Sequence, residues 1–423
     1  MNEPVLPHIV VIGGGFGGLT FCQAFPARRA RITLIDRSNH HLFQPLLYQV
    51  ATAGLSVPDI AQPIRSIISE RRDITVLMDE VERIDLANRQ VTGKTTTLNY
   101  DYLVIAAGAR TAYFGHSEWA EHAPGLKSID DALHIRRGIL AALERAEISH
   151  DETERARLMT VVVAGGGPTG VELAGAFAEL FRNTLADDFR NVDPARGRVI
   201  LIEAGPRLLP QFPAETAEVG LRQLKELGVE VRLNTRVQDI QDRAVLLGNE
   251  TIAAETIVWA AGVEANPLTK SLGTPLDRAG RLKVNPDLTL PGQSNVFAIG
   301  DLVSLVDPKG QTVPGVAPAA MQMGKYVSTL ISHDIEGWAK PNTRDPFVYR
   351  DKGSLATIGR SRAVALIAGM QLSGFLAWLA WLVIHLLFLV GLRNKVSVVL
   401  SWTYSFFTYN RSSRVIYNGK RED

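Results

Sequence analysis

Glycine residues at a fixed spacing occur twice in this chain, each time directly after a run of β-branched residues. The first run, HIVVIGGGFGG, begins at residue 8, and the second, TVVVAGGGPTGVE, begins at residue 160. In a turn from strand to helix, one glycine allows the sharp turn, one lets backbone approach a phosphate, and one allows close helix packing. The helix N-terminus then faces the phosphate charge. We therefore predict two dinucleotide-binding turns, built on Gly13, Gly15 and Gly18 and on Gly165, Gly167 and Gly170.

An acidic residue follows each glycine run, at the end of a second apolar segment. Asp36 closes the segment RITLID, and Glu203 closes the segment RVILIE. In dinucleotide-binding folds an acid at this place accepts hydrogen bonds from ribose hydroxyls. One glycine run alone is weak evidence, but two with the complete strand, turn, helix, strand and acid context indicate two bound dinucleotides.

The composition excludes several classes of function. The 423 residues carry a net charge of +1 with 21% charged residues, so no basic field indicates a nucleic-acid partner. The N-terminal segment MNEPVLPHIVV lacks a basic stretch followed by an apolar one, so we expect no secretory signal. The single cysteine, Cys22, cannot form an intrachain disulfide, a redox pair or a cysteine-based metal site, and we expect it to be a buried apolar residue. No metal site is predicted.

The order of apolar segments predicts the elements that position these residues. YDYLVIAAGAR (100–110) and ETIVWAAGVEANP (255–267) both read as strands that end in Ala-Ala-Gly, one in each half. NVFAIGD (295–301) reads as a further strand that returns to the first half, and a helix follows in APAAMQMGKYVSTLI. Doubly wound sheets bind ligands beyond the carboxyl ends of their strands, so these strand ends are expected to converge on the cofactors.

The predicted fold class is α/β, with two Rossmann-like, three-layer ββα dinucleotide-binding domains, the second inserted in the first. The predicted boundaries are 1–120 with 286–345 for the first domain, 121–285 for the second and 346–423 for a C-terminal helical region. A charged helical stretch, Ser128 to Arg157, leads into the second domain. The irregular segment 39–56, NHHLFQPLLYQVATAGLS, fits no helical stripe, and long loops of this kind are usually functional.

The C-terminal region contains two predicted helices. The segment 374–392 is apolar apart from His385, and about 18 residues would extend roughly 27 Å, which is marginal against a hydrocarbon core of about 30 Å. More basic residues follow it than precede it, which opposes the positive-inside tendency for a single span. In the segment 396–409 hydroxyl side chains are expected on one helical face, opposite aromatics and valines: Ser397, Ser401, Ser405 and Thr408. We expect both helices to lie in a membrane interface, with a buried dimerisation or core helix as the alternative.

With these motifs established, the chain resembles the two-dinucleotide-binding-domain flavoproteins and, within them, the type II (alternative, non-proton-pumping) NADH:quinone oxidoreductases. The resemblance covers nearly the whole chain and is carried by GGGFGG, FQPLLYQVATAGLS, YDYLVIAAGA, GGGPTGVELAG, VWAAGV, FAIGD, APAAMQMGKYV, LATIGR and the basic aromatic tail. It implies that FAD binds non-covalently at the first glycine run (8–18, the first fingerprint) and that NADH binds as substrate at the second (160–172, the second fingerprint). Two electrons would then pass to a membrane quinone, ubiquinone or menaquinone, without proton pumping.

The resemblance also assigns cofactor-binding residues. The residues expected to hold FAD are Gly13, Gly15, Phe16, Gly17, Gly18, Asp36, Arg37, Ala107, Gly108, Gly300, Asp301 and Ala319. The residues expected to hold NADH are Gly165, Gly167, Pro168, Thr169, Gly170, Glu203 and Gly262. A carboxylate at Glu203 would repel a 2′-phosphate and favour NADH over NADPH, although Arg207 could allow some NADPH use. The alternative interpretation is that Glu203 is only a solvated acid at a strand end.

Glu172 and Gln322 are the predicted catalytic residues. Glu172 is expected in the first turn of the second fingerprint helix, where the helix dipole favours a negative charge and a structural role is the alternative. The resemblance places Glu172 beside the nicotinamide and flavin rings, where it would position the nicotinamide and move protons. The family's Ala-Gln-x-Ala-x-Gln helix start keeps its second glutamine here as Gln322, whereas Pro318 replaces the first and removes its side-chain hydrogen bond.

The remaining predicted quinone contacts are Tyr48, Gln49, Pro318 and Lys395. His385 is either a structural histidine in an apolar helix or a proton relay. The predicted membrane surface covers residues 371–414, the predicted location is the cytoplasmic face of the cell inner membrane as a peripheral, monotopic protein, and a homodimer is a further expectation.

Alternative functions differ in the residues they require. Disulfide reductases and sulfide:quinone oxidoreductases share this fold but need redox cysteines, which Cys22 alone does not supply. A ferredoxin-type NAD(P)H reductase with a soluble partner and a non-catalytic FAD- and NADH-binding interaction protein are the two alternatives carried forward.

Overall fold

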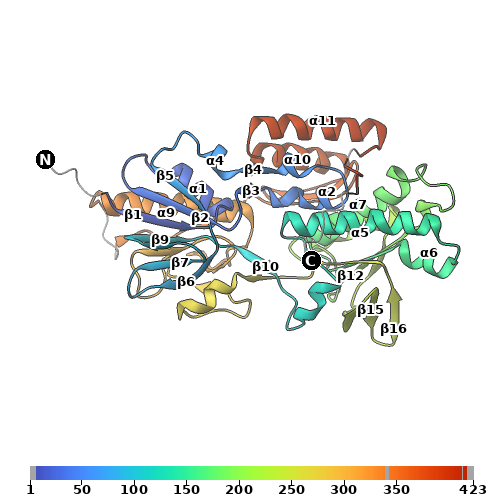
Figure 1. Cartoon of the computed structure of the whole chain (residues 1–423), viewed down its shortest axis with the longest axis horizontal. Helices are drawn as coiled ribbons and strands as arrows, with labels where there is room; N and C mark the ends of the chain where they lie inside the picture. Colours follow the sequence, from blue (N-terminus) through green and yellow to red (C-terminus); the bar gives the residue numbers. More distant parts are fainter. Residues whose placement is uncertain (1–5, 339–342, 412, 417–423) are drawn as a thin grey trace. The chain divides into compact units, whose positions relative to one another are not determined.

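The computed structural model describes residues 6–338, 343–411 and 413–416. The chain divides into two compact units, shown with their elements in Figure 1. The first unit comprises Met1–Leu42, Gln62–Arg110 and Val263–Lys352, and the second comprises Phe43–Ala61, Thr111–Gly262 and Gly353–Asp423. Each unit is built around its own parallel sheet.

The first unit contains a five-stranded parallel sheet with the order β20-β9-β1-β2-β5. Its strands are β1 (His8–Ile12), β2 (Arg31–Asp36), β5 (Ile74–Met78), β9 (Tyr102–Ile105) and β20 (Val296–Ala298). The pairing of β20 with β9 confirms that the predicted strand at 295–301 returns to the first sheet. Helices α1 (Phe16–Ala24) and α9 (Ala317–Ile335) pack closely, since a Cβ on Gly324 would overlap the carbonyl oxygen of Gly17.

A small antiparallel sheet completes the first unit. Its strands are β6 (Val81–Asp85), β7 (Gln90–Gly93) and β8 (Thr97–Asn99). One core joins this sheet, the parallel sheet and the two helices, because Ile84, Leu103 and Val327 belong to the same buried cluster. The other elements are β3 (His40–Leu42), β4 (Ala61–Pro63), α4 (Ile64–Ile67), β10 (Ala109–Thr111), β18 (Val263–Ala265), η5 (Pro267–Leu272), β19 (Leu282–Lys283) and β21 (Val303–Ser304).

The second unit repeats this plan with a four-stranded parallel sheet, order β13-β12-β11-β17. Its strands are β11 (Thr160–Ala164), β12 (Arg198–Ile202), β13 (Glu230–Arg232) and β17 (Thr256–Trp259), and its antiparallel sheet contains β14 (Asp239–Gln241), β15 (Ala244–Leu247) and β16 (Glu250–Ala253). The helical elements are α2 (Leu47–Ala51), α3 (Val57–Ile60), α5 (Ile129–Ile148), α6 (Glu152–Leu158), α7 (Pro168–Glu179) and α8 (Ala214–Glu226), with short turns η1 (Gln44–Leu46), η2 (Ser117–Glu121), η3 (Leu180–Thr184) and η4 (Pro194–Arg196).

The C-terminal elements pack on the second unit. They are β22 (Ser354–Gly359), β23 (Arg362–Ile367), β24 (Met370–Ser373), α10 (Gly374–Phe388) and α11 (Leu392–Thr408). Strand β22 lies against α7 so closely that a Cβ on Gly175 would overlap the carbonyl oxygen of Ile358. Among the described residues, no helix combines the length and the apolar content needed to cross a membrane.

The structure differs from the predicted elements in several places. The predicted helix from Ser128 to Arg157 is two helices, because Ser149 is extended and the Asp151 side chain caps α6 through the Thr153 N–H. The segment 39–56, predicted to be irregular, contains β3, η1 and α2.

The compact units also differ from the predicted domain boundaries. Residues 263–285 fall in the first unit, where β18 pairs with β10 and β19 pairs with β21. Residues 353–423 fall in the second unit because β22 packs on α7, and the predicted region 346–423 includes residues 412 and 417–423, which lie outside the described part of the chain.

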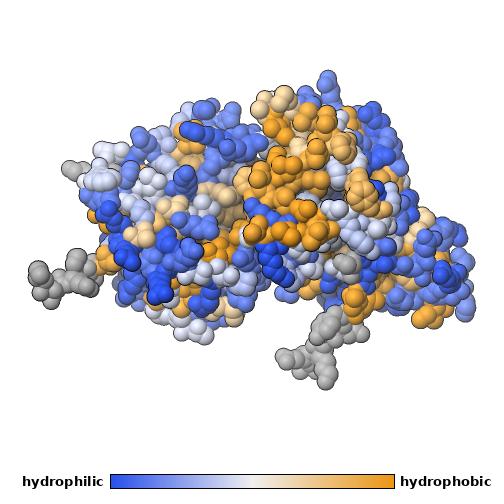
Figure 2. All heavy atoms as spheres, turned by 90° about the horizontal axis from the view of Figure 1, so that it is seen from above, coloured by the Kyte–Doolittle hydropathy of each residue, from blue (hydrophilic) through white to orange (hydrophobic). Residues whose placement is uncertain are grey.

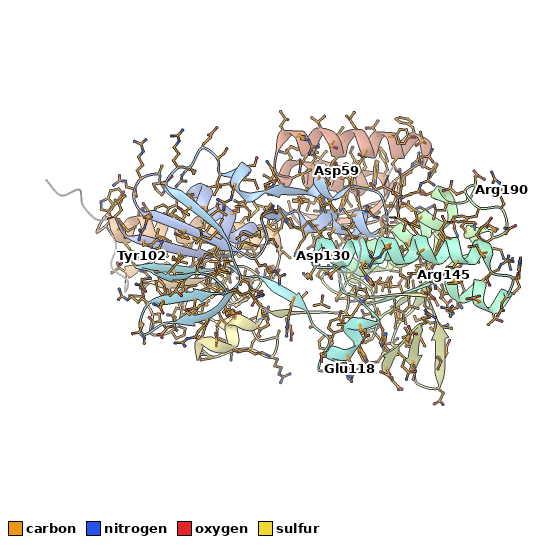
Figure 3. All side chains as sticks on the ribbon, viewed as in Figure 1. Asp59, Tyr102, Glu118, Asp130, Arg145 and Arg190 are labelled. Atoms are coloured by element: carbon orange, nitrogen blue, oxygen red, sulfur yellow. The ribbon has the colours of Figure 1, made fainter. Side chains whose placement is uncertain are left out.

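Helix α11 presents a mixed face to the rest of its unit. The Ser397 hydroxyl donates to Asp59 (2.6 Å), which is labelled in Figure 3, and the Trp402 indole donates to Gln49 (2.8 Å). The predicted hydroxyl face is therefore correct for Ser397. The prediction of valines and aromatics on the opposite face is correct for Val396, Val399, Tyr404 and Phe407, which are exposed. It fails for Val398, which is fully buried, and for Trp402 and Phe406, which are partly buried on the inward side. The inward face of α11 therefore carries large side chains, which exclude water, together with polar groups, which form hydrogen bonds with buried polar atoms.

Candidate functional site

The first fingerprint forms a turn in which the first and the last glycine cannot be replaced by a larger residue. Gly13 has a φ of +101°, and a Cβ on Gly18 would overlap the carbonyl oxygen of Gly13. Gly15 is different, because a Cβ placed there would meet no atom within 4 Å. Open space at Gly15 is what a bound phosphate needs, so this turn fits the pyrophosphate of a dinucleotide.

The helix after this turn has an N-terminal end without a side-chain cap. Helix α1 has Gly15 as its N-cap, no capping side chain and no acidic residue in its first turn. The first N–H groups of a helix have no partner within the helix, and their combined dipole favours an anion.

Asp36 is held in place by this turn. Its Oδ2 accepts from the Gly14 N–H (2.6 Å), and its Oδ1 accepts from the Ser38 N–H (2.7 Å). A carboxylate has about four acceptor sites, so each oxygen retains capacity for a ribose hydroxyl. The neighbouring Arg37 is exposed.

The other predicted FAD residues lie in the same unit. Gly300 follows β20 with a φ of +83°, and Asp301 beside it is half-buried. Asn266 orders the end of β9, because its N–H donates to the Gly108 carbonyl oxygen (3.1 Å). Ala319 is buried near the start of α9, and Phe16 and Ala107 are half-buried. Gly17 lies close to Ile299, because a Cβ placed on Gly17 would be 3.1 Å from the Ile299 Cδ1 atom.

The second fingerprint has the same construction in the second unit. Gly165 has a φ of +113°, a Cβ on Gly170 would overlap the Gly165 carbonyl oxygen, and a Cβ on Gly167 would meet nothing within 4 Å. Pro168 starts α7, Thr169 is exposed, and the first turn of α7 has no acidic residue. The end of β17 comes close, because a Cβ on Gly165 would lie 2.6 Å from the Ala260 carbonyl oxygen, with Gly262 two residues on.

Glu203 repeats the arrangement of Asp36. Its Oε2 accepts from the Gly166 N–H and its Oε1 accepts from the Gly205 N–H, both at 2.6 Å. Arg207, the residue that could favour a 2′-phosphate, donates to the Pro210 carbonyl oxygen (3.0 Å). Glu203 is therefore an ordered carboxylate that follows β12 and contacts the second glycine turn.

Glu172 does not lie where the sequence suggested. Helix α7 begins at Pro168 and its first turn contains no acidic residue, so the prediction that Glu172 lies in the first turn is wrong. Its carboxyl group instead lies among buried groups, and this burial raises its pKa to about 8. The backbone N–H of Thr357 and the Trp381 indole oppose that rise. A carboxyl with a pKa near neutrality can hold or release a proton at physiological pH.

Glu172 faces a cavity of about 120 Å³ within the second unit. Helix α7 contributes Glu172, Ala176 and Glu179 to its wall, which are spaced at i, i+4 and i+7 and so share one face. The rest of the wall comes from α2, the β22 end and the C-terminal helices, including Tyr48, Gln49, Thr357, Arg360, Trp381, Trp402, Phe406, Tyr409 and Arg411.

The predicted quinone residues Tyr48 and Gln49 are joined at this cavity. The Gln49 amide donates to the Tyr48 hydroxyl (2.9 Å), and its carbonyl oxygen accepts from the Trp402 indole (2.8 Å). The structure therefore brings Tyr48, Gln49 and Glu172 to one cavity.

The other predicted residues of the quinone site have different surroundings. Gln322, in the first unit, donates to the Arg350 carbonyl oxygen and accepts from the Arg350 N–H, each at 3.0 Å. Pro318 occupies the first turn of α9, where proline is well tolerated. Lys395 donates to the Leu387 carbonyl oxygen (3.2 Å) near the end of α10.

His385 is ordered by its own helix. Its Nδ1 lies 2.8 Å from the Trp381 carbonyl oxygen, and its ring stacks on Trp381 with 4.1 Å between centroids. Burial lowers the pKa of His385 to about 4, so the ring is neutral at pH 7. These contacts favour the structural interpretation of this histidine.

Sequence reasoning missed Glu179, Arg360 and Arg411. The Arg411 guanidinium lies 3.4 Å from Glu179, and the Arg360 backbone N–H donates to the same carboxylate. The signal for Glu179 was present, since it lies seven residues after Glu172 on the same helix. The two arginines are more than 180 residues away in sequence from Glu179 and have no local signal.

Two family models match this chain. The pyridine nucleotide-disulphide oxidoreductase model matches residues 7–324, and the NDH2 C-terminal domain model matches residues 352–410. The type II NADH:quinone oxidoreductase NdhA of Mycobacterium tuberculosis is 45% identical over 97% of this chain and 89% of that protein. The chain belongs to the type II NADH:quinone oxidoreductase family. A second relative from the same organism, Ndh, is 44% identical over 98% of this chain and 91% of that protein.

Solved structures share the fold. The NDH2 of Plasmodium falciparum in complex with NADH has a TM-score of 0.89 over 97% of this chain and 100% of that chain, at 22% identity. The sulfide:quinone oxidoreductase of Aquifex aeolicus has a TM-score of 0.72 over 92% of each chain, at 21% identity. These likenesses confirm the predicted α/β fold class.

Family membership confirms the predicted enzyme class. The chain is a flavoprotein oxidoreductase of the NADH dehydrogenase type, and FAD is the typical cofactor of its family. The exclusion of thiol chemistry agrees with the structure, because Cys22 is fully buried and burial raises the pKa of its thiol to about 12. A thiol with that pKa does not form the reactive thiolate at neutral pH.

Proposed function

We propose that this chain passes a hydride from NADH to FAD and then two electrons to a membrane quinone, without pumping protons. The observation that carries the proposal is the presence of two separate glycine turns that fit dinucleotides, together with the buried carboxyl group of Glu172 beside the apolar C-terminal helices. FAD, when bound, supplies the chemistry that accepts a hydride and releases single or paired electrons.

The first fingerprint is assigned to FAD. The open space at Gly15 and the N-terminal end of α1 fit the pyrophosphate, and Asp36 fits the adenosine ribose. Asp301 follows the strand that returns to this sheet, which supports a contact with the more distant part of the cofactor. These residues bind and orient; they do not themselves react.

The second fingerprint is assigned to NADH. Gly167 and the start of α7 fit its pyrophosphate, and the ordered carboxylate of Glu203 fits a ribose with a free 2′-hydroxyl. A 2′-phosphate would meet this negative charge, so NADPH is expected to be a poor substrate.

The quinone is assigned to the polar groups near α10 and α11. Tyr48 and Gln49 offer a hydroxyl and an amide next to Trp381 and Trp402, which supply aromatic surface. Glu172 would hold a proton at its carboxyl oxygen for the quinone. Gln322 and Lys395 stay as weaker candidates, because both side chains already bond backbone groups.

The exposed face of α10 and α11 is assigned to the membrane surface. Figure 2 shows an apolar patch there, and its residues are between 38% and 78% exposed: Phe375, Leu376, Leu379, Val383, Leu387, Phe388, Leu392, Val396, Val399, Leu400, Tyr404 and Phe407. Exposed apolar area of this extent is rare on a soluble monomer. We assign the protein to the cytoplasmic face of the inner membrane, as a peripheral protein that meets its quinone at this face.

Steady-state NADH oxidation by the FAD-loaded chain tests the proposal. A soluble quinone, a ferredoxin and oxygen are supplied in turn as the acceptor. The proposal predicts that quinone gives the fastest oxidation. Fully bound FAD with no quinone-dependent rate would contradict it, and a ferredoxin-dependent rate would favour the soluble-partner reductase.

The predicted homodimer is tested separately, by measuring the mass of the protein in detergent by sedimentation.

A further inference from the structure

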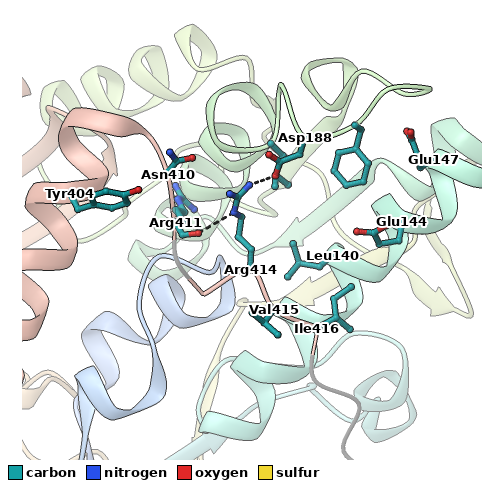
Figure 4. Close-up of a pocket in the computed structure, with 12 residues that line it drawn as sticks. Leu140, Glu144, Glu147, Asp188, Tyr404, Asn410, Arg411, Arg414, Val415 and Ile416 are labelled. Carbon is teal, nitrogen blue, oxygen red and sulfur yellow. Dashed lines mark hydrogen bonds and ion pairs between the residues drawn. The ribbon is translucent and has the colours of Figure 1, made fainter.

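Two cavities in the second unit share one side chain. The inner cavity, of about 120 Å³, contains Glu172 and Glu179, and a larger cavity of about 610 Å³ lies beyond it. Arg411 lines both, and Figure 4 shows it in the larger one. The larger cavity reaches solvent, because its wall includes the exposed acids Glu144 and Asp188.

The turn that follows α7 contributes neighbouring residues to the two cavities. Glu179 is the last residue of α7 and is followed by the π-helical turn η3 (Leu180–Thr184). Thr184 lines the inner cavity, whereas Leu185 lines the outer one. Turns of this kind inside or after helices often mark functional positions. The carboxylate of Glu179 lines the inner cavity and contacts Arg411, the side chain that lines both cavities.

Glu179 has an environment suited to proton exchange. Its side chain is 17% exposed, and it contacts the Arg411 guanidinium at 3.4 Å. Burial raises the pKa of Glu179 above its ordinary value, while Arg411 and the Arg360 N–H hold it down. The charged or titratable groups that face it are Arg411, Arg360, Arg362 and Tyr48.

The inner cavity is suited to water. The Arg360 guanidinium is clamped between Phe406 (4.2 Å) and Tyr409 (4.1 Å), and its buried Nη1 has no acceptor among the described residues. A buried donor needs an acceptor, and water supplies one where a polar cavity is large enough. The volume of about 120 Å³ exceeds the roughly 30 Å³ that one water occupies in the liquid.

The second half of the proposed reaction requires a proton from solvent. NADH supplies two electrons and one proton as hydride, whereas quinol formation takes up two electrons and two protons. One proton per turnover must therefore enter from water. Glu172 and Glu179 lie seven residues apart on α7, about 10 Å along its axis, which is too far for direct transfer but suits a short water chain.

We propose that Glu179 is the proton-access residue of this enzyme, which takes a proton from the outer cavity and passes it through water to Glu172. The inference rests on the proposed function. When the Glu179 carboxyl group releases its proton, its O–H bond breaks and a water O–H bond forms, and an outer water then reprotonates the carboxylate. No electron moves at Glu179. Arg411 positions the carboxylate and does not itself titrate.

Rapid mixing of the Glu179→Gln variant tests the proposal. Glutamine keeps the size of the side chain and one of its two acceptor oxygens but carries no exchangeable acid. The flavin absorbance of the NADH-mixed enzyme is expected to bleach at the wild-type rate, because hydride transfer takes no proton from water. Reoxidation by a soluble quinone is expected to slow at least tenfold, with a larger solvent deuterium isotope effect. Glu179→Asp is expected to recover part of the rate.

Glu255→Gln is the matched control, since Glu255 is a mostly buried acid that also contacts arginines, among them Arg145 and Arg157. It is expected to reoxidise as the wild type does. A Glu179→Gln variant with wild-type reoxidation over the whole pH range would overturn the proposal. Equal slowing of both half-reactions, or the same slowing in Glu255→Gln, would also overturn it and indicate a structural role. If Glu179→Gln loses FAD, the Glu179→Asp variant tests the proposal in its place. Reoxidation of Glu179→Asp at the wild-type rate with an unchanged isotope effect would overturn the proposal, and slowed reoxidation would support it. A wild-type enzyme that quinone does not reoxidise would instead contradict the proposed function.

Discussion

At the scale of single residues, position along one helix separates two carboxyl groups with different surroundings. Glu172 lies beyond the first turn of α7, where burial raises its pKa to about 8, and Glu179 lies at the helix end beside Arg411. Neither needs a nucleophile nearby, because the hydride chemistry belongs to the nucleotides. The protein contributes orientation and proton supply.

Glu172 makes the stability of the protein depend on pH. Its folded pKa of about 8 lies above its ordinary value of 4.5, so its contribution to stability is complete below about pH 4.5 and is lost as the pH rises toward 8. Glu172→Gln removes this loss. The melting temperature of Glu172→Gln minus that of the wild type is expected to increase as the pH rises from about 5 to about 8. The FAD content of both proteins is measured as a check. A difference that does not change with pH would contradict the buried, protonated carboxyl.

We expect Glu203 to determine the choice between NADH and NADPH. Glu203→Gln keeps the acceptor for the Gly166 N–H but removes the negative charge. The ratio of kcat/KM for NADPH to that for NADH is expected to rise roughly tenfold, which corresponds to about 1.4 kcal/mol. Steady-state kinetics with both nucleotides measure it, with the exposed Glu154→Gln as control. An unchanged ratio would contradict this role and would favour the alternative interpretation, in which Glu203 is only a solvated acid at the end of a strand.

At the scale of elements, the two fingerprint turns are the same device in different units. In each, the outer glycines are required by a positive φ or by a close approach of backbone, and the middle glycine faces open space. The helix that follows has no acid in its first turn to compete with a phosphate. The two middle glycines therefore allow the two nucleotides to be tested separately.

Alanine at a middle glycine adds a methyl group only to the ligand space. Gly15→Ala is expected to fold but to retain FAD at least tenfold more weakly, while Gly167→Ala is expected to keep FAD and to raise the KM for NADH by roughly the same factor. Each variant is the control for the other. Flavin content and NADH titration measure the two effects. If Gly167→Ala lost FAD and Gly15→Ala did not, the cofactor assignment would be reversed.

At the scale of the whole molecule, sequence patterns predicted what depends on neighbours in the chain. The glycines, Asp36 and Glu203 act through contacts within one βαβ unit, so their spacing was sufficient. The Arg411 contact with Glu179 joins residues 232 apart, and the inward position of Trp402 depends on which side of α11 meets α2. The bond between Gln322 and Arg350 is likewise set by tertiary packing, which is why a free amide was expected there.

The apolar face of α10 and α11 gives a prediction about membrane binding. Leu387 and Leu400 are 68% and 64% exposed, and the double change to glutamate is expected to reduce binding to anionic phospholipid vesicles at least tenfold. Ile148→Glu is the matched control, because Ile148 is 75% exposed at the end of α5. Vesicle flotation measures the bound fraction. Equal binding by the double variant and the wild type would remove α10 and α11 as the membrane surface.

The central claim is that electrons from NADH leave this protein on a quinone. Its most direct test is an anaerobic single turnover, in which the FAD-loaded enzyme is reduced by one equivalent of NADH and then mixed with a short-chain quinone. The account predicts that the flavin absorbance returns and that one quinol forms for each NADH consumed. A flavin that stays reduced with quinone, but is reoxidised by a ferredoxin, would contradict it.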